Sequence, residues 1–247
     1  MKKITLFLFV LVNILSVEVA CSQNFTLGLR GGISIPNLTA GGAEKNPLNT
    51  GYSSRLGPDF AIFGEYKISS LFSIEPMIEY SSQGGKKDGL QAFPNPMGTT
   101  PPYLYANFKS EAKLNYLLVP ILAKFGWNLS SHSPIRIYID AGPFAGFLLS
   151  AHQVTSGSSM IYADPQGTIP ASPSAQPFDA NNNIKDQLNT FNFGVSGNLG
   201  LAYHFSKSNV FIEGGGNYGF LNIQKGTANG KNQTGAGTAA VGYGYTF

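Results

Sequence analysis

Hydrophobic and polar residues alternate along much of this chain, most regularly between Phe191 and Phe205. Within that segment the odd-numbered positions are mostly large and apolar, whereas the even-numbered positions are small or polar. A period of two is typical of a β-strand whose two faces meet different surroundings. The same test predicts seven further strands, at about residues 24–35, 58–67, 71–82, 113–127, 135–149, 209–223 and 238–247.

The connections between these strands alternate between long and short. The long ones cover residues 36–57, 83–112, 150–190 and 224–237, and the short ones lie near 68–70, 128–134 and 206–208. Each strand has about 10 to 15 residues, which suits a tilted crossing of a bilayer, and no run of roughly 18 to 20 apolar residues follows Gln23. Outer-membrane barrels have short periplasmic turns and long external loops. The pattern therefore predicts an all-β fold, an eight-stranded antiparallel up-and-down transmembrane β-barrel with both termini on the periplasmic side.

The N-terminal segment has the pattern of an export signal. Lys2 and Lys3 precede an apolar run at 4–17, and the small residues Ala20 and Ser22 follow. We expect a signal peptide at 1–22 and an outer-membrane β-barrel domain at 23–247. Cys21, the only cysteine, could instead carry a lipid, although the charged residue 18 stands where lipoprotein signals have an aliphatic one.

Aromatic residues gather at the predicted strand ends. Membrane barrels carry aromatic girdles at both interfaces with water, and their outer faces contact lipid. The alternative is that these rings form the core of a soluble sandwich. We expect the periplasmic girdle to comprise Phe25, Tyr66, Phe72, Trp127, Tyr203, Phe205, Tyr245 and Phe247.

Charged residues of the strands fall on the faces opposite the apolar ones, which would point into the barrel. Eight strands enclose an interior that side chains just fill, and isolated charges there would be too costly. We therefore expect an ion-pair network in which Arg30, Lys124 and Arg136 meet the acidic side chains, and a polar plug in place of an open pore. The residues expected in this network are Arg30, Glu65, Lys67, Glu75, Glu79, Lys124, Arg136, Asp140 and Glu213.

Composition and spacing narrow the chemistry. Charged residues make up 12% of the chain and the formal net charge is +3, so nothing favours nucleic acid as a partner. The spacing of His and acidic residues predicts no metal, cofactor or catalytic site. One alternative is a lipid-modifying enzyme that uses His152 with Ser150, Ser156 or Asp164.

The predicted long loops carry aromatic residues among prolines. The prolines limit the conformational entropy of the loops, and the exposed aromatic rings provide contact area. We expect a binding surface formed by Phe93, Tyr103, Tyr105, Phe108, Tyr162 and Phe178. The sequence thus predicts a non-enzymatic barrel with a structural or interaction role. A small solute or ion channel is a further alternative.

Several short segments resemble the PorT-like outer-membrane β-barrel family. They are the proline-containing strands at 74–80 and 114–125, the Asp-Ala-Gly-Pro block at 140–143 and the aromatic end at 245–247. The resemblance implies a small outer-membrane barrel, and a few members of that family are linked to protein secretion or surface assembly. The expected partners are outer-membrane lipid, the barrel-assembly machinery through the C-terminal strand, and an extracellular or secretion-machinery protein.

Overall fold

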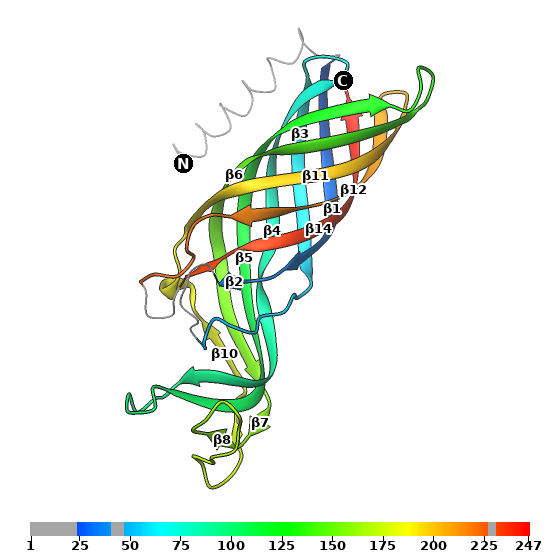
Figure 1. Cartoon of the computed structure of the whole chain (residues 1–247). Helices are drawn as coiled ribbons and strands as arrows, with labels where there is room; N and C mark the ends of the chain where they lie inside the picture. Colours follow the sequence, from blue (N-terminus) through cyan, green and yellow to red (C-terminus); the bar gives the residue numbers. More distant parts are fainter. Residues whose placement is uncertain (1–23, 41–46, 227–230) are drawn as a thin grey trace, which may run out of the picture.

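The computed structural model describes residues 24–40, 47–226 and 231–247, so the predicted signal peptide lies outside the described residues. Eight antiparallel strands form a closed ring (Figure 1). Closure is made by the first and last strands, in which Thr26 lies opposite Thr246 and Ser34 opposite Thr238. The predicted eight-stranded barrel is confirmed. In ring order the strands are β1 (Phe25–Pro36), β3 (Gly57–Lys67), β4 (Phe72–Pro94), β5 (Tyr103–Asn128), β6 (Ile135–Ser156), β11 (Phe191–Phe205), β12 (Ser208–Gly219) and β14 (Gly235–Thr246).

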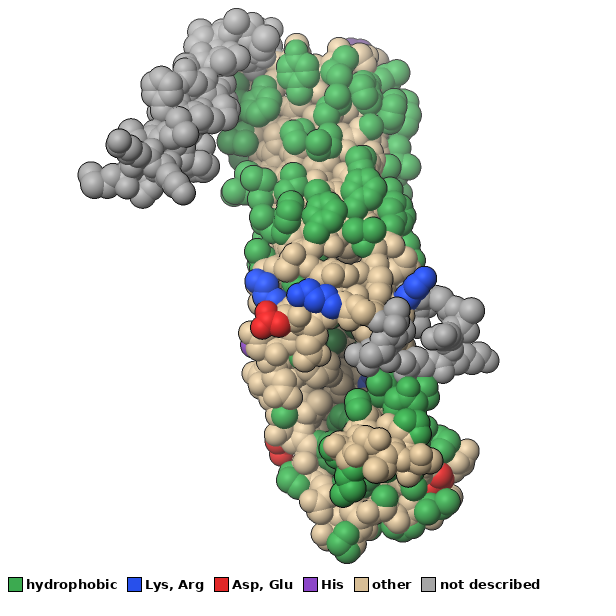
Figure 2. All heavy atoms as spheres, turned by 90° about the vertical axis from the view of Figure 1, so that its left-hand side faces the viewer, with side chains coloured by type: hydrophobic (Ala, Val, Ile, Leu, Met, Phe, Trp, Pro, Cys, Tyr) green, Lys and Arg blue, Asp and Glu red, His purple; other side chains and the backbone are tan. Residues whose placement is uncertain are grey.

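The outer surface of the ring is apolar. Leu199, Ile212 and Val241 are more than half exposed, whereas their neighbours Phe211 and Ala240 point inward and are buried. On the face drawn in Figure 2, exposed hydrophobic side chains cover one half of the molecule, and charged side chains begin where that apolar belt ends. Since exposed apolar patches of this extent are rare on soluble proteins, the belt is a surface for lipid.

All eight aromatics expected in the periplasmic girdle lie at the end of the barrel where the short turns are. Phe25 and Phe72 are only half-buried, with their ring centres 6.3 Å from Phe247 and 4.9 Å from Phe125. A second group of exposed rings, including Phe191 and Phe193, lies on the same strands further along. About ten residues of β11 separate the two groups, which matches a tilted strand crossing an apolar band about 25 Å tall.

The prediction of a long loop at 83–112 was wrong, because β4 and β5 continue as a paired ladder through most of this segment. These strands have 23 and 26 residues and β6 has 22, whereas β1, β12 and β14 have 12 each. Outside a bilayer neither face of a strand needs to be apolar, so the alternation that marks the membrane segments fades there. We call residues 83–112 and 150–190 the extension; Figure 1 shows it projecting beyond one end of the ring.

Short elements complete the extension and its surroundings. Residues 150–190, expected as one long loop, begin with the end of β6 and contain four small strands and a 3-10 turn. None of the described helices is long and apolar enough to span a membrane. The short elements are β2 (Thr39–Ala40), β7 (Ser158–Ser159), β8 (Ile161–Tyr162), β9 (Gln176–Pro177), β10 (Ala180–Asn183), η3 (Lys185–Gln187) and β13 (Asn232–Gln233).

The core lies inside the ring as two apolar clusters. The turn-side cluster lies toward the short turns, and the extension-side cluster lies toward the extension. Apolar side chains therefore fill much of the interior, in addition to the polar plug that the sequence predicts. The turn-side cluster comprises Ala61, Phe63, Met77, Leu122, Tyr138, Ala202 and Phe211. The extension-side cluster comprises Leu38, Ala112, Leu114, Tyr116, Leu118, Phe144, Leu148, Ala151, Leu188 and Ile223.

Two glycines make room for the rings of the turn-side cluster. A Cβ atom at Gly242 would overlap the ring of Phe211, and one at Gly200 would overlap the ring of Tyr138. Each ring therefore lies flat against bare backbone, a packing that any side chain at these glycines would prevent.

Replacing Gly242 with Val should lower the free energy of unfolding by about 1–3 kcal/mol, because the added side chain overpacks the lumen against Phe211. The measurement is equilibrium unfolding in lipid vesicles, followed by fluorescence of Trp127, the only tryptophan. The matched control is Gly214→Ala, since a Cβ there meets only the Thr238 carbonyl at 3.8 Å. Equal stability of the two variants would contradict the packing described here.

Candidate functional site

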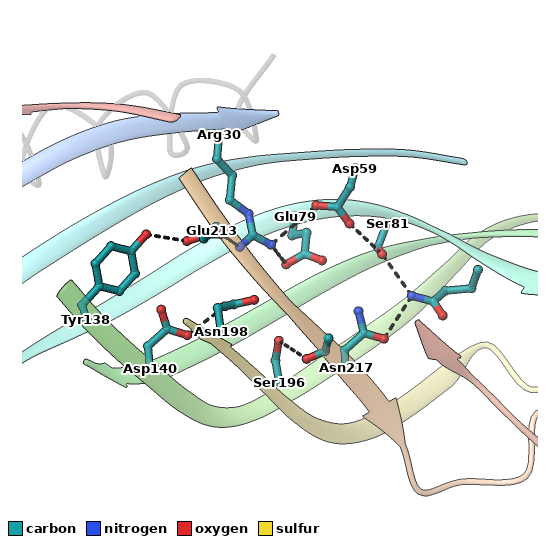
Figure 3. A network of polar contacts seen from close by, with 12 residues as sticks. Arg30, Asp59, Glu79, Ser81, Tyr138, Asp140, Ser196, Asn198, Glu213 and Asn217 are labelled. Carbon is teal, nitrogen blue, oxygen red and sulfur yellow. Dashed lines mark hydrogen bonds and ion pairs between the residues drawn. The ribbon is translucent and has the colours of Figure 1, made fainter. Parts of the chain in front are cut away.

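Arg30 lies at the centre of the lumen and contacts acidic side chains from three other strands (Figure 3). Its Nη2 atom is 2.8 Å from Glu79 Oε2 and 3.5 Å from Asp59 Oδ1, and its Nη1 atom donates a hydrogen bond to Glu213. The guanidinium has several N–H donors in a planar arrangement, which suits contact with more than one carboxylate. Because these residues come from β1, β3, β4 and β12, one side chain ties together strands on different sides of the ring.

Lys124 forms a second centre nearer the short turns. Its Nζ atom is 2.7 Å from Glu75 Oε2 and 3.1 Å from Glu65 Oε2. The ammonium also lies 4.2 Å from the ring centre of Tyr138, a distance at which a cation is attracted to the face of the ring. Tyr138 in turn donates a hydrogen bond of 2.9 Å to Glu213 Oε2, so it connects the two centres.

Three residues expected in the network do not contact an oppositely charged partner within the described part of the chain. Lys67 is exposed at the end of β3. Arg136 donates to the Ser70 carbonyl and to Asn128 instead of to a carboxylate. Together with His204, these two cations line a cavity of about 70 Å³ at the short-turn mouth of the barrel.

Asp140, the third of these residues, is buried in the lumen but is held by an amide. Asn198 donates a hydrogen bond of 2.8 Å to its Oδ1 atom. Arg136 and Lys67 therefore lie beside the short turns and outside the expected ion pairs, and Asp140 has a neutral partner in place of the expected ionic one.

Asp59 is a charged member of the network that was not among the residues expected from the sequence. It is 1% exposed, contacts Arg30 and accepts a hydrogen bond of 3.0 Å from Ser81. The signal was present, because the alternation that turns Glu65 inward also turns Asp59 inward. Tyr138 and Asn198 carried no such signal, since uncharged polar residues are common on both faces of a strand.

The network sets the register of the barrel and occupies part of its lumen. Removing one partner of a buried ion pair leaves an unpaired charge, which is strongly destabilising. A shift of one residue in any of these strands would turn its charged side chain into lipid. Buried apolar side chains of the two clusters lie in the lumen at other heights along the barrel.

The residues of the hydrolase alternative are not assembled as a triad. His152 Nδ1 lies 3.0 Å from Asn181 Oδ1, and Asp164 accepts hydrogen bonds from N–H groups of its own loop. Those bonds lower the pKa of the Asp164 carboxyl, whose charge therefore stabilises a turn. Within the described ranges no three His, Cys, Asp or Glu side chains converge as a metal ion would require.

The aromatics expected on loops lie on the extension, and three of them pack on one another. Tyr105 of β5 pairs with Tyr162 of β8, and Tyr103 pairs with Pro94 across the hairpin. The rings of Phe108 and Phe178 stack with their centres 4.5 Å apart, and Phe93 packs edge-on against Phe178 at 5.6 Å. These rings therefore stabilise the extension, and two of them also line a cavity there.

This cavity, which we call the extension cavity, has a volume of about 540 Å³. Phe93 and Phe108 form part of its wall, and Lys87 is the buried cation among its lining residues. Burial lowers the pKa of Lys87 to about 8. The extension cavity is thus a mixed apolar and cationic space outside the membrane-spanning part of the barrel.

A closed eight-stranded ring with a lipid-facing belt and a charged interior defines an outer-membrane β-barrel. Residues 21–225 match the family model described as outer membrane protein beta-barrel domain, and the chain belongs to that family. No curated protein sequence matches the chain.

Solved structures similar to this chain include three small outer-membrane proteins. Neisserial surface protein A is 14% identical, with 90% of this chain and 97% of that chain covered and a TM-score of 0.40. OprG from Pseudomonas aeruginosa is 11% identical, with coverages of 91% and 97% and a TM-score of 0.38. Ail of Yersinia pestis is 11% identical, with coverages of 91% and 99% and a TM-score of 0.37. At these identities the likeness concerns the fold alone.

Replacing Arg30 with Met should lower the free energy of unfolding by about 3–5 kcal/mol, because it leaves carboxylates buried without a cation. Adding Glu213→Gln should recover part of the lost stability, since it removes one of the carboxylates left without a cation. The measurement is equilibrium unfolding in lipid vesicles.

The control for this prediction is Lys67→Met, which removes an exposed lysine without an ionic partner among the described residues and should change stability by about 0.5 kcal/mol or less. If Arg30→Met and Lys67→Met unfold alike, the network does not stabilise the barrel.

Proposed function

We propose that this outer-membrane barrel is a non-enzymatic, non-conducting interaction protein that acts through its extension. The observation that carries the proposal is that the lumen is filled while the extension holds a sizeable cavity. Apolar side chains, the Arg30 centre and the Lys124 centre occupy the ring at successive heights. The part of the chain that offers room for a partner is therefore the extension.

The filled lumen speaks against the solute-channel alternative. Eight-stranded barrels have interiors that side chains fill, whereas aqueous pores need 16 or more strands, roughly. Here Tyr116, Tyr138 and Phe144 are each at most 2% exposed inside the ring. A conducting path would require these buried side chains and the ion pairs to move together.

The lack of an assembled triad around His152 supports the non-enzymatic part of the proposal. A nucleophile and its base must come within hydrogen-bond reach of each other. His152 contacts Asn181, and Ser150 accepts a hydrogen bond from Asn115, so the two side chains are held by other partners.

We further propose that the extension is extracellular and that both termini are periplasmic. The short turns, the start of β1 and the end of β14 all lie at one end of the barrel, and the extension lies at the other end. In barrels of this class the short turns face the periplasm. A predicted signal peptide at 1–22 is consistent with export to that compartment.

The partners named from the sequence remain proposals. β14 would pair with the barrel-assembly machinery before β1 is available, since both edges of β14 are occupied by β1 and β12 in the finished ring. The resemblance to PorT-like barrels supports a role in protein secretion or surface assembly, in which the extension would contact an extracellular or secretion-machinery protein.

Cysteine labelling tests the orientation. Met97→Cys, at the 83% exposed tip of the β4–β5 hairpin, should react with a membrane-impermeant maleimide in intact cells. Ser131→Cys, in the exposed turn between β5 and β6, should react only after the outer membrane is broken. The wild-type chain, with Cys21 as its one cysteine, gives the background. The reverse labelling pattern would invert the proposed topology.

Planar-bilayer recording tests the closed lumen. The wild-type protein should show no steady conductance, because buried ion pairs and apolar side chains fill the ring. A large open porin reconstituted in the same bilayers is the positive control. Steady unit openings of the wild-type protein would overturn the non-conducting proposal and favour the channel alternative.

A further inference from the structure

The extension cavity is closed on the side of the lumen. Leu38, Leu114 and Leu188 line it and also belong to the extension-side cluster, so that cluster forms its floor. Its volume of about 540 Å³ lies within the range of small-molecule sites. The cavity is therefore a blind space suited to holding a ligand, and it is not the mouth of a channel.

Lys87 makes the wall of this cavity chemically specific. The residue lies on the inward face of β4 and is 7% exposed. Its Nζ atom donates a hydrogen bond of 2.6 Å to the Leu48 carbonyl and lies 4.4 Å from the ring centre of Tyr52. Among the described residues no carboxylate lies within 4.0 Å of this ammonium, and no Asp or Glu lines the cavity. A buried cation without an anion is costly unless an anion is supplied from outside.

The rest of the lining is largely apolar, with neutral hydrogen-bonding groups between the apolar side chains. Phe93, Phe108 and Ile223 provide apolar surface, while Gln91 and Gln153 provide amides. The Gln91 amide donates to the Phe108 carbonyl, and the Gln153 amide donates to Ser110, so both are already partnered within the wall. The charge that the wall leaves without a counter-ion is therefore cationic, and the surrounding surface is apolar with neutral polar groups.

We propose that the extension cavity binds a small amphiphile with an apolar body and a single carboxylate head group, and that the head group pairs with Lys87. The inference rests on the proposed function, since it names the ligand class of the same extension. The apolar walls take the body of the ligand out of water. The head group provides the anion that the described part of the chain does not supply, and charge-assisted hydrogen bonds fix its position.

Calorimetric titration of the full-length protein in lipid nanodiscs tests this inference with three probes that share one chain length: octanoate, octanol and octylamine. Partition into the lipid is measured on empty nanodiscs and subtracted. Octanoate should bind saturably at one site, at least about tenfold more tightly than octylamine, because an ion pair with a buried ammonium favours the anion by that much or more.

Lys87→Met should remove the preference for octanoate over octylamine to within about twofold while octanol binding stays. The matched control is Lys86→Met, the neighbouring exposed lysine on the opposite face of β4, which should keep the preference. Ala112→Phe, which fills the cavity, should abolish binding of all three probes. A shift in gel mobility on boiling checks that each variant is folded.

The preference of the cavity for octanoate over octylamine should also fall as pH rises from 7 to 9. The pKa of Lys87 lies at about 8 because burial disfavours the ammonium, so the charge that attracts octanoate is lost across this range. Among the described residues, the other charged or titratable groups lining the cavity are Tyr52 and Lys225. Burial raises the pKa of Tyr52, so that ring stays neutral here. Octanol binding should not change with pH.

The outcomes separate this inference from the proposed function. If no probe binds saturably, or if Lys87→Met leaves the preference for octanoate intact, the ligand assignment is wrong. If no probe binds and the planar bilayers show no conductance, the proposed interaction role remains, and its partner is a macromolecule and not a small amphiphile. Steady conductance of the wild-type protein would instead overturn the proposed function.

Discussion

The structure depends on ion pairs that hold charged side chains of the membrane strands inside a closed sheet. Arg30 pairs with three carboxylates, on β3, β4 and β12, and Lys124 pairs with two more. Each pair is made between strands, so the charges are satisfied only in the assembled ring with its strands in register. The apolar clusters on either side of the Arg30 centre keep water from its ion pairs, which strengthens their attraction and raises the cost of separating them.

The alternation of residues predicted the face of each membrane strand because lipid on one side and a charged interior on the other select opposite side chains. Pro120 illustrates this: it lies on the less apolar face of its strand and is buried inside the ring, with gaps in the ladders beside it. The same rule failed beyond Gln83, where no lipid imposes an apolar face and a regular ladder looked like a loop.

The ion-pair partners were harder to predict than the faces. Alternation tells which side of the sheet a residue faces, but not how far along the barrel axis it lies. Arg136 and Lys124 both face inward, yet Arg136 lies at the start of β6 beside the turn and reaches Ser70 and Asn128. The height of a residue along the barrel axis depends on strand tilt and stagger. Closure of the sheet sets both, so the pattern of a single strand does not reveal them. The cavity around Lys87 could not be predicted from the sequence either, because segments far apart in the chain form its walls.

The unequal strands give the barrel a slanted rim. β4, β5 and β6 are adjacent in the ring and rise as a tall wall, whereas β1, β12 and β14 end early on the opposite side (Figure 1). A hydrogen-bonded wall of this kind resists bending far better than a loop of equal length. Approach to the extension is consequently directional: a partner arriving from behind the tall wall meets a continuous sheet, while one arriving over the low side meets the segments around Tyr52 and Ile223 that line the extension cavity.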